Sequence, residues 1–209
     1  PMGVLVDIPD PSTALIDVSD GQGGVVRAFA KGLFGFEDSS GVTRVIDTTL
    51  SAHPDGFRAA AVPYNATLPL RYAAGLEWTA QGAGASQVRV VPLGTNTTAP
   101  DGRLHESDHV VYPAAWPAID IVATALGDGV KEHLVVRSGA APRTLSWRVA
   151  HAPGAVLRIE NGAVMLDADG QARTLFRPPL ATDAAGQLVR VYYELADPTA
   201  SATTVAMHW

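Results

Sequence analysis

Cysteine is absent from this 209-residue sequence. Its absence excludes a disulfide framework, a thiolate metal site and a thiol nucleophile, although it does not fix the compartment, because secreted bacterial proteins often lack cysteine as well. Long apolar runs are also missing. No stretch approaches the roughly 20 residues of a membrane helix, and no basic-then-apolar leader precedes the first expected strand. The sequence therefore predicts a soluble segment without a membrane span.

Positive charge is scarce. Lys and Arg total 15 against 21 for Asp and Glu, and the formal charge of −6 is spread along the chain. This balance argues against nucleic acid as a partner. The chain begins at Pro1 rather than methionine, and its last residues, 203–209, have the composition of a strand. We expect a piece of a longer polypeptide, which leaves room for a signal peptide or a further domain outside it.

Helical periodicity is missing too: no apolar pattern at helical spacing persists for two turns, whereas short β-rich runs are many. The clearest alternation places Leu145, Trp147 and Val149 on one face of a strand. Similar alternations run through 119–125 and 189–194. The sequence predicts an all-β fold, antiparallel and sandwich-like, built from hairpins as one large unit or two small ones.

Turn residues predict three hairpins in the second half of the chain. Asn161-Gly162, Asp169-Gly170 and Asp128-Gly129 each separate two β-rich runs, and these dipeptides tolerate the positive φ angles of tight turns. The first half is looser, with expected strands at 25–30, 42–47, 68–72, 76–79 and 87–93. The Thr-, Asn-, Pro- and Gly-rich segment 94–103 is the expected joint. We place a soft boundary there, between an N-terminal unit 1–100 and a C-terminal unit 101–209.

The sharpest catalytic candidate is His105-Glu106-Ser107-Asp108-His109, which satisfies the zinc-peptidase pattern H-E-x-x-H. That chemistry needs a helix, because helical spacing aims both imidazoles at one zinc ion. Here the motif follows Pro100-Asp101-Gly102 and runs into a strand-like segment, so at most one helical turn fits. We interpret it as a polar loop that can make an adventitious metal contact, with His105 and His109 as the only candidate metal ligands.

Other signatures of catalysis or ligand binding are incomplete. Asp167-Ala168-Asp169-Gly170 lacks the later bidentate acid of a calcium loop, and Gly21–Gly24 lacks the Lys-Ser/Thr of a phosphate loop. No G-x-S-x-G elbow occurs. The sequence thus predicts no catalytic residues and no cofactor. The aromatic residues could instead provide a sugar-stacking platform, although Trp116 and Trp147 are expected in the core.

Two separated segments have recognisable sequences. Residues 41–50, GVTRVIDTTL, with Asp55-Gly56-Phe57 after them, resemble the stretch that precedes the repeat region of large bacterial Rhs/YD-repeat proteins. Residues 111–122, VYPAAWPAIDIV, and 129–136, GVKEHLVV, resemble a second block with the same order and spacing. Arg44 stands where the family often has Trp and Ala118 where it has Gly, and the chain contains no tyrosine-aspartate repeat.

This resemblance covers roughly residues 25 to 195. It implies a β-rich leader module of a secreted or cell-surface protein, placed before a β-shell that encloses a toxin. The implied partners are other domains of the same polypeptide or a secretion or toxin assembly. A similar block also opens β-rich modules in other large secreted bacterial proteins, including some with β-propeller repeats.

The residues of the second block have a structural interpretation of their own. Pro113 and Pro117 fix their φ angles and donate no backbone hydrogen bond, so the segment between Tyr112 and Ile119 should be an ordered loop with Trp116 as a buried plug. Asp120 is expected to accept backbone N–H groups from that loop. Lys131 and Glu132 are adjacent in a strand, point to opposite faces and so form no catalytic pair.

Taken together, these patterns predict a non-enzymatic structural or interaction module of a secreted Rhs/YD-repeat-type protein. The alternatives are a carbohydrate- or surface-binding β-sandwich and, with less support, a zinc hydrolase at His105 and His109. The sequence names neither a ligand nor an effector.

Overall fold

The computed structural model describes residues 4–10, 13–19, 25–31, 35–38, 40–80, 87–168 and 170–209. Within these ranges the fold is all-β and antiparallel, as predicted, and its single helical element is the short 3-10 helix η1 (Tyr72–Ala74). No helix in the described part of the chain is long and apolar enough to cross a membrane.

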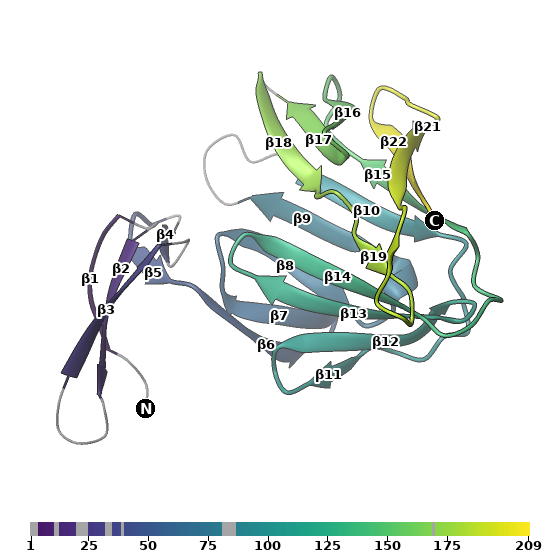
Figure 1. Ribbon diagram of the computed structural model, residues 1–209. Coiled ribbons are helices and arrows are strands. Elements are labelled where there is room, and N and C mark those ends of the chain that lie inside the picture. The colour runs from purple at the N-terminus through teal and green to yellow at the C-terminus, as the bar shows by residue number, and fades with distance from the viewer. Residues whose placement is uncertain are drawn as a thin grey trace.

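An eight-stranded antiparallel sheet forms one layer of the fold (Figure 1). Its strands, in spatial order, are β21 (Tyr192–Ala196), β22 (Ala202–His208), β15 (Thr144–Ala150), β10 (Gln87–Leu93), β9 (Leu76–Ala80), β8 (Tyr64–Pro69), β7 (Gly56–Ala61) and β6 (Asp47–His53).

Two smaller sheets pack on the same face of this layer. The four-stranded sheet consists of β11 (Arg103–His105), β12 (His109–Trp116), β13 (Ile119–Leu126) and β14 (Gly129–Val136), and the three-stranded sheet of β16 (Val156–Glu160), β17 (Ala163–Ala168) and β18 (Gln171–Phe176). Leu145 and Trp147 join the core beneath the first, and Val149, on the same face of β15, joins the core beneath the second. The two cores therefore lie side by side in one two-layer fold.

Three further sheets are small. They are β1 (Val4–Asp10), β2 (Thr13–Ser19) and β3 (Val25–Lys31); β4 (Gly35–Glu37) with β5 (Thr43–Val45); and β19 (Ala181–Thr182) with β20 (Leu188–Val189).

The predicted alternations appear as buried faces. In β13 every second residue, from Ile119 to Ala125, is buried, and in β15 Leu145, Trp147 and Val149 are at most 4 % exposed. A strand with one apolar face packs that face against the core. The alternation therefore determines both that the segment is a strand and the register in which it pairs. The third alternation is interrupted, because β20 ends at Val189 and β21 begins at Tyr192.

Two of the three predicted hairpin turns lie within the described residues and are confirmed. Asn161 and Gly162 have φ angles of 51° and 80° between β16 and β17. Asp128-Gly129 connects β13 to β14, which pair from Ile119 opposite Val136 to Leu126 opposite Gly129. Asp169 of the third turn lies outside the described residues, although β17 and β18 on either side of it do pair.

The boundary expected near residue 100 does not follow the sheets. Strand β10 pairs with β9 on one side and with β15 on the other, so residues from both sides of the boundary form one sheet. The core beneath the four-stranded sheet likewise combines Leu50 and Phe57 with Ile119 and Ile121. The expected joint, 94–103, instead connects the eight-stranded sheet to the four-stranded one.

The segment expected as a loop between Tyr112 and Ile119 is partly strand. Strand β12 continues to Trp116, and its pairing with β13 is irregular between Tyr112 and Trp116. Such an irregularity accommodates Pro113, which cannot donate to the ladder. Ala114 and Ala118 have φ angles of 49° and 58°, a conformation that favours glycine.

Replacing Ala118 by Gly should stabilise the fold by up to about 1 kcal/mol. The Cβ of Ala118 makes the left-handed backbone unfavourable, and glycine removes that cost while adding some entropy to the unfolded chain. Urea unfolding measures the change. Ala123→Gly, in the extended strand β13, is the matched control and should lower the free energy of unfolding. If both variants lowered the free energy of unfolding by the same amount, the prediction would be contradicted.

Candidate functional site

Asp120 and Arg137 close the loop that precedes β13. Asp120 Oδ1 accepts the Ala114 N–H at 2.8 Å, the kind of contact expected from the sequence, and Oδ2 accepts two N–H groups of Arg137 at 2.8 and 2.5 Å. The Arg137 backbone N–H donates to Ala118 O at 2.8 Å. The Ala114 N–H and the Arg137 guanidinium hold the pKa of Asp120 below its usual value. These contacts give Asp120 a positioning role in the loop.

Trp116 and Tyr112 anchor the four-stranded sheet on the eight-stranded layer. Both are 1 % exposed, so Trp116 is the buried plug that the flanking prolines predicted. Trp116 Nε1 donates to Leu93 O at 2.9 Å, and the Tyr112 hydroxyl donates to Pro69 O at 2.8 Å. Each aromatic ring thus fills the core while its polar atom bonds the main chain of the other layer.

Glu132, which is partly buried, belongs to a polar chain that borders this core. On β14, Lys131 is exposed on the outer face, whereas Glu132 stands on the inner face between Val130 and Leu134, which are partly buried and pack against the core. The two residues therefore face opposite sides, as the sequence predicted. Tyr72 of η1 donates its hydroxyl to Glu132 Oε2 at 3.0 Å, and Trp147 Nε1 donates to the Tyr72 hydroxyl at 3.3 Å. The chain Trp147–Tyr72–Glu132 connects β15, η1 and β14.

The surroundings of Glu132 favour its neutral form. Burial raises its pKa from 4.5 to about 7, and the hydrogen bond from Tyr72 offsets only part of this effect. No ion pair among the described residues includes Glu132. Burial, together with the charge of Glu132, also raises the pKa values of the neighbouring Tyr72, Tyr112 and Tyr193, that of Tyr193 to about 12. Strand alternation predicted that Lys131 and Glu132 face opposite sides, but it did not indicate the tyrosine partners of Glu132.

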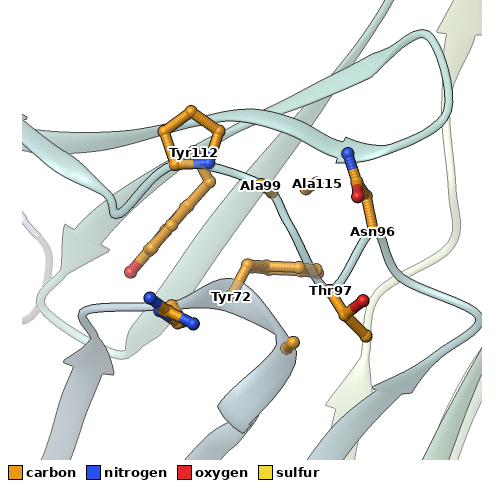
Figure 2. Close-up of a pocket in the computed structure, with 9 residues that line it drawn as sticks. Tyr72, Asn96, Thr97, Ala99, Tyr112 and Ala115 are labelled. Atoms are coloured by element: carbon orange, nitrogen blue, oxygen red, sulfur yellow. The ribbon is translucent and has the colours of Figure 1, made fainter.

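Little space for a substrate remains beside this cluster. The pocket next to Tyr72 and Tyr112, closed on its other side by Asn96, Thr97 and Ala115, has a volume of about 20 Å³ (Figure 2). This volume suits about one water molecule. A carboxyl group with a pKa near neutrality can exchange a proton, yet general acid–base catalysis also needs a reacting group within hydrogen-bond reach. The arrangement suits packing between the layers better than turnover.

His105 and His109 lie in a hairpin rather than a helix. They pair directly across β11 and β12, with Glu106 and Ser107 at φ angles of 51° and 63° in the turn. A hairpin does not provide the helical spacing on which the zinc-peptidase motif depends. The motif therefore lacks its defining geometry, although the two imidazole rings do stack, with centroids 4.9 Å apart.

The remaining candidates do not form a site within the described residues. Asp167 sits in β17 and accepts a hydrogen bond from Arg158 at 2.6 Å, while Asp169 and Gly21–Gly24 lie outside the described residues. Of the four tryptophans, Trp116 and Trp147 are 1 % and 4 % exposed, whereas Trp78 and Trp209 are partly exposed. The first pair is therefore unavailable as a sugar-stacking platform.

Comparison of the chain with models of protein families, with curated proteins and with solved structures found no match. The resemblance to Rhs/YD-repeat proteins therefore rests on residues 41–57 and 111–136 alone.

Replacing Glu132 by Gln should remove a pH dependence of stability. The unfolded chain releases this proton near pH 4.5 and the folded chain near pH 7, so the free energy of unfolding should fall as pH rises through this interval. The pKa difference corresponds to roughly 3 kcal/mol above pH 7. Glu132→Gln should match the native chain at pH 4 and exceed its stability at pH 8.

Urea unfolding of both chains between pH 4 and pH 8 measures this difference. Glu160→Gln, which alters an exposed carboxylate on β16, controls for the general loss of a negative charge. If the curves of the native chain and Glu132→Gln ran parallel across the interval, the carboxyl group would not titrate as described.

Proposed function

We propose that this chain is a non-catalytic structural and interaction module of a large secreted or cell-surface bacterial protein of the Rhs/YD-repeat kind. In this proposal it docks against neighbouring β-rich domains of the same polypeptide or of a secretion or toxin assembly. The observation that carries the proposal is a pair of highly exposed leucines on the ordered β19–β20 hairpin.

The apolar face of this hairpin is defined by Leu180 and Leu188, which are 82 % and 75 % exposed. Leu188 pairs with Thr182 in the hairpin, and Leu180 lies directly before β19. Single exposed apolar residues are common on protein surfaces, but neighbouring leucines this exposed favour an interaction site. We call this face the leucine face.

The hairpin holds the leucine face in a defined conformation. Asp183 Oδ1 accepts the N–H groups of Ala185 and Gln187, each at 2.9 Å, and the Asp183 N–H donates to Gln187 O at 2.9 Å. At the base of the hairpin, Arg177 forms an ion pair with Asp128 in the β13–β14 turn. A surface that is already ordered loses less conformational entropy on binding.

Burial of both leucines by a partner would contribute roughly 3 to 6 kcal/mol before the entropic cost of association. A binding free energy of this size is sufficient for a partner domain on the same polypeptide, because the covalent connection gives that domain a high effective concentration at the leucine face. The filled interior supports the same proposal, since the aromatic side chains occupy the space between the layers. The partner class follows from the resemblance of residues 41–57 and 111–136.

A carbohydrate- or surface-binding module is the second proposal. It is favoured by an open hollow of about 190 Å³ lined by Trp209, Arg143, Arg137 and Ser138 among others. An indole ring beside guanidinium groups suits an acidic sugar. Titration of tryptophan fluorescence with acidic oligosaccharides distinguishes this proposal from docking through the leucine face.

The docking proposal predicts that neighbouring domains protect the leucine face. Hydrogen exchange of residues 180–189 should be slower in the parent polypeptide than in this chain alone. The double variant Leu180→Lys/Leu188→Lys should restore fast exchange, because two charges cannot be buried in an apolar contact. Val156→Lys, at a residue 59 % exposed on β16, is the matched control and should leave the protection intact. Equal exchange with and without the neighbouring domains would contradict the proposal.

A further inference from the structure

The β11–β12 hairpin places two imidazole rings face to face at the rim of the four-stranded sheet. His105 and His109 are directly opposite each other in the ladder, their ring centroids are 4.9 Å apart, and the ring planes differ by 28°. Paired residues in antiparallel strands project to the same face. The closeness of the rings thus follows from the register of the hairpin.

Two backbone hydrogen bonds hold the turn between the two histidines. The Leu50 N–H of β6 donates to Ser107 O at 2.7 Å, which fixes the tip of the hairpin to the eight-stranded sheet. The Asp108 N–H donates to His105 O at 3.3 Å. Glu106 and Ser107 adopt the positive φ angles of a tight turn although neither is glycine. The backbone therefore sets the separation of the rings before any ligand arrives.

Asp108 orients one of the two rings. Its Oδ1 is in hydrogen-bond contact with His109 Nδ1. A carboxylate that accepts the Nδ1–H leaves Nε2 unprotonated and available as an electron-pair donor, the usual arrangement behind a metal-bound histidine. His105 is exposed, and within the described part of the chain its ring has no hydrogen-bond partner. It is therefore free to rotate toward a shared ligand.

We propose that His105 and His109 form a two-imidazole binding site for a divalent transition-metal ion, with Asp108 as the residue that positions His109. Imidazole favours copper, nickel and zinc over magnesium and calcium, which prefer oxygen ligands. A nitrogen from each ring can lie at about 2.0–2.1 Å from one ion after rotation of the His105 side chain. By the Irving–Williams order, Cu²⁺ should bind these imidazole ligands more tightly than Ni²⁺ or Zn²⁺ does.

The coordination sphere of this site is incomplete. The described residues contain no cluster of three or more candidate ligating side chains, so water or a group from a partner would fill the other positions. By register, Lys131 lies on the same face two strands away from His109, and Arg103 lies two residues before His105. The positive charges of Lys131 and Arg103 repel a bound metal ion, whereas the negative charges of Asp108 and Glu106 attract it. We expect moderate affinity and no hydrolytic activity.

Isothermal titration of the purified chain with Cu²⁺, and separately with Zn²⁺, tests the proposal. One equivalent of Cu²⁺ should bind, with electron paramagnetic resonance showing nitrogen ligands, and Zn²⁺ should bind more weakly. His105→Ala and His109→Ala should each weaken Cu²⁺ binding at least tenfold, and Asp108→Asn should weaken it about tenfold.

Matched controls separate this site from other histidines and from loss of the fold. His133→Ala, on the outer face of β14, should bind Cu²⁺ as the native chain does. Cu²⁺ should raise the thermal midpoint of the native chain but not of His105→Ala, since a ligand stabilises only the folded state that binds it. Absence of stoichiometric Cu²⁺ binding, or equal binding by the native chain and His105→Ala, would overturn the proposal.

Discussion

The fold depends on aromatic side chains that fill the space between two β layers and place their polar atoms on the opposite layer. Trp147 of the eight-stranded sheet donates to Tyr72, and Tyr72 donates to Glu132 of the four-stranded sheet. Around this chain the rings of Tyr112 and Trp116 pack on Tyr72 at centroid distances of 5.4 and 5.2 Å. Because a buried polar atom without a partner costs about 1–3 kcal/mol, these hydrogen bonds determine how the layers can fit together.

Burying the carboxyl group of Glu132 costs the folded state free energy, and the position of this residue indicates what it contributes in return. It stands on the inner face of β14, which is an edge strand of the four-stranded sheet. An ionisable side chain that faces inward on an edge strand discourages pairing with a foreign strand, a known protection against aggregation. The interior therefore serves the packing and selectivity of the fold. The contact sites that we propose, the leucine face and the two-histidine hairpin, both lie on the exposed surface.

Much of the fold was predictable because local patterns determine it. Alternation and turn dipeptides were sufficient for β13, β15 and the hairpins at Asp128-Gly129 and Asn161-Gly162. The soft boundary near residue 100 does not coincide with a break between sheets, because the pairing of β10 with β15 joins residues more than 50 positions apart, and no local signal records such a pairing. For the same reason the sequence could place Lys131 and Glu132 on opposite faces of a strand but could not reveal the contact of Glu132 with Tyr72, which lies on a short helix where a strand was expected. The two histidines illustrate a third case: the motif implied helical spacing, whereas strand pairing brings the rings together.

A double-mutant cycle between Tyr72→Phe and Glu132→Gln, measured by urea unfolding at pH 8, tests most directly whether the hydroxyl–carboxylate contact couples the layers. Phenylalanine removes the donor and glutamine removes the charge of the acceptor, with little change in shape. If Tyr72 and Glu132 interact as described, the two effects should be non-additive by about 1 kcal/mol or more. Effects that add within about 0.3 kcal/mol would contradict this account of how the two layers are held together.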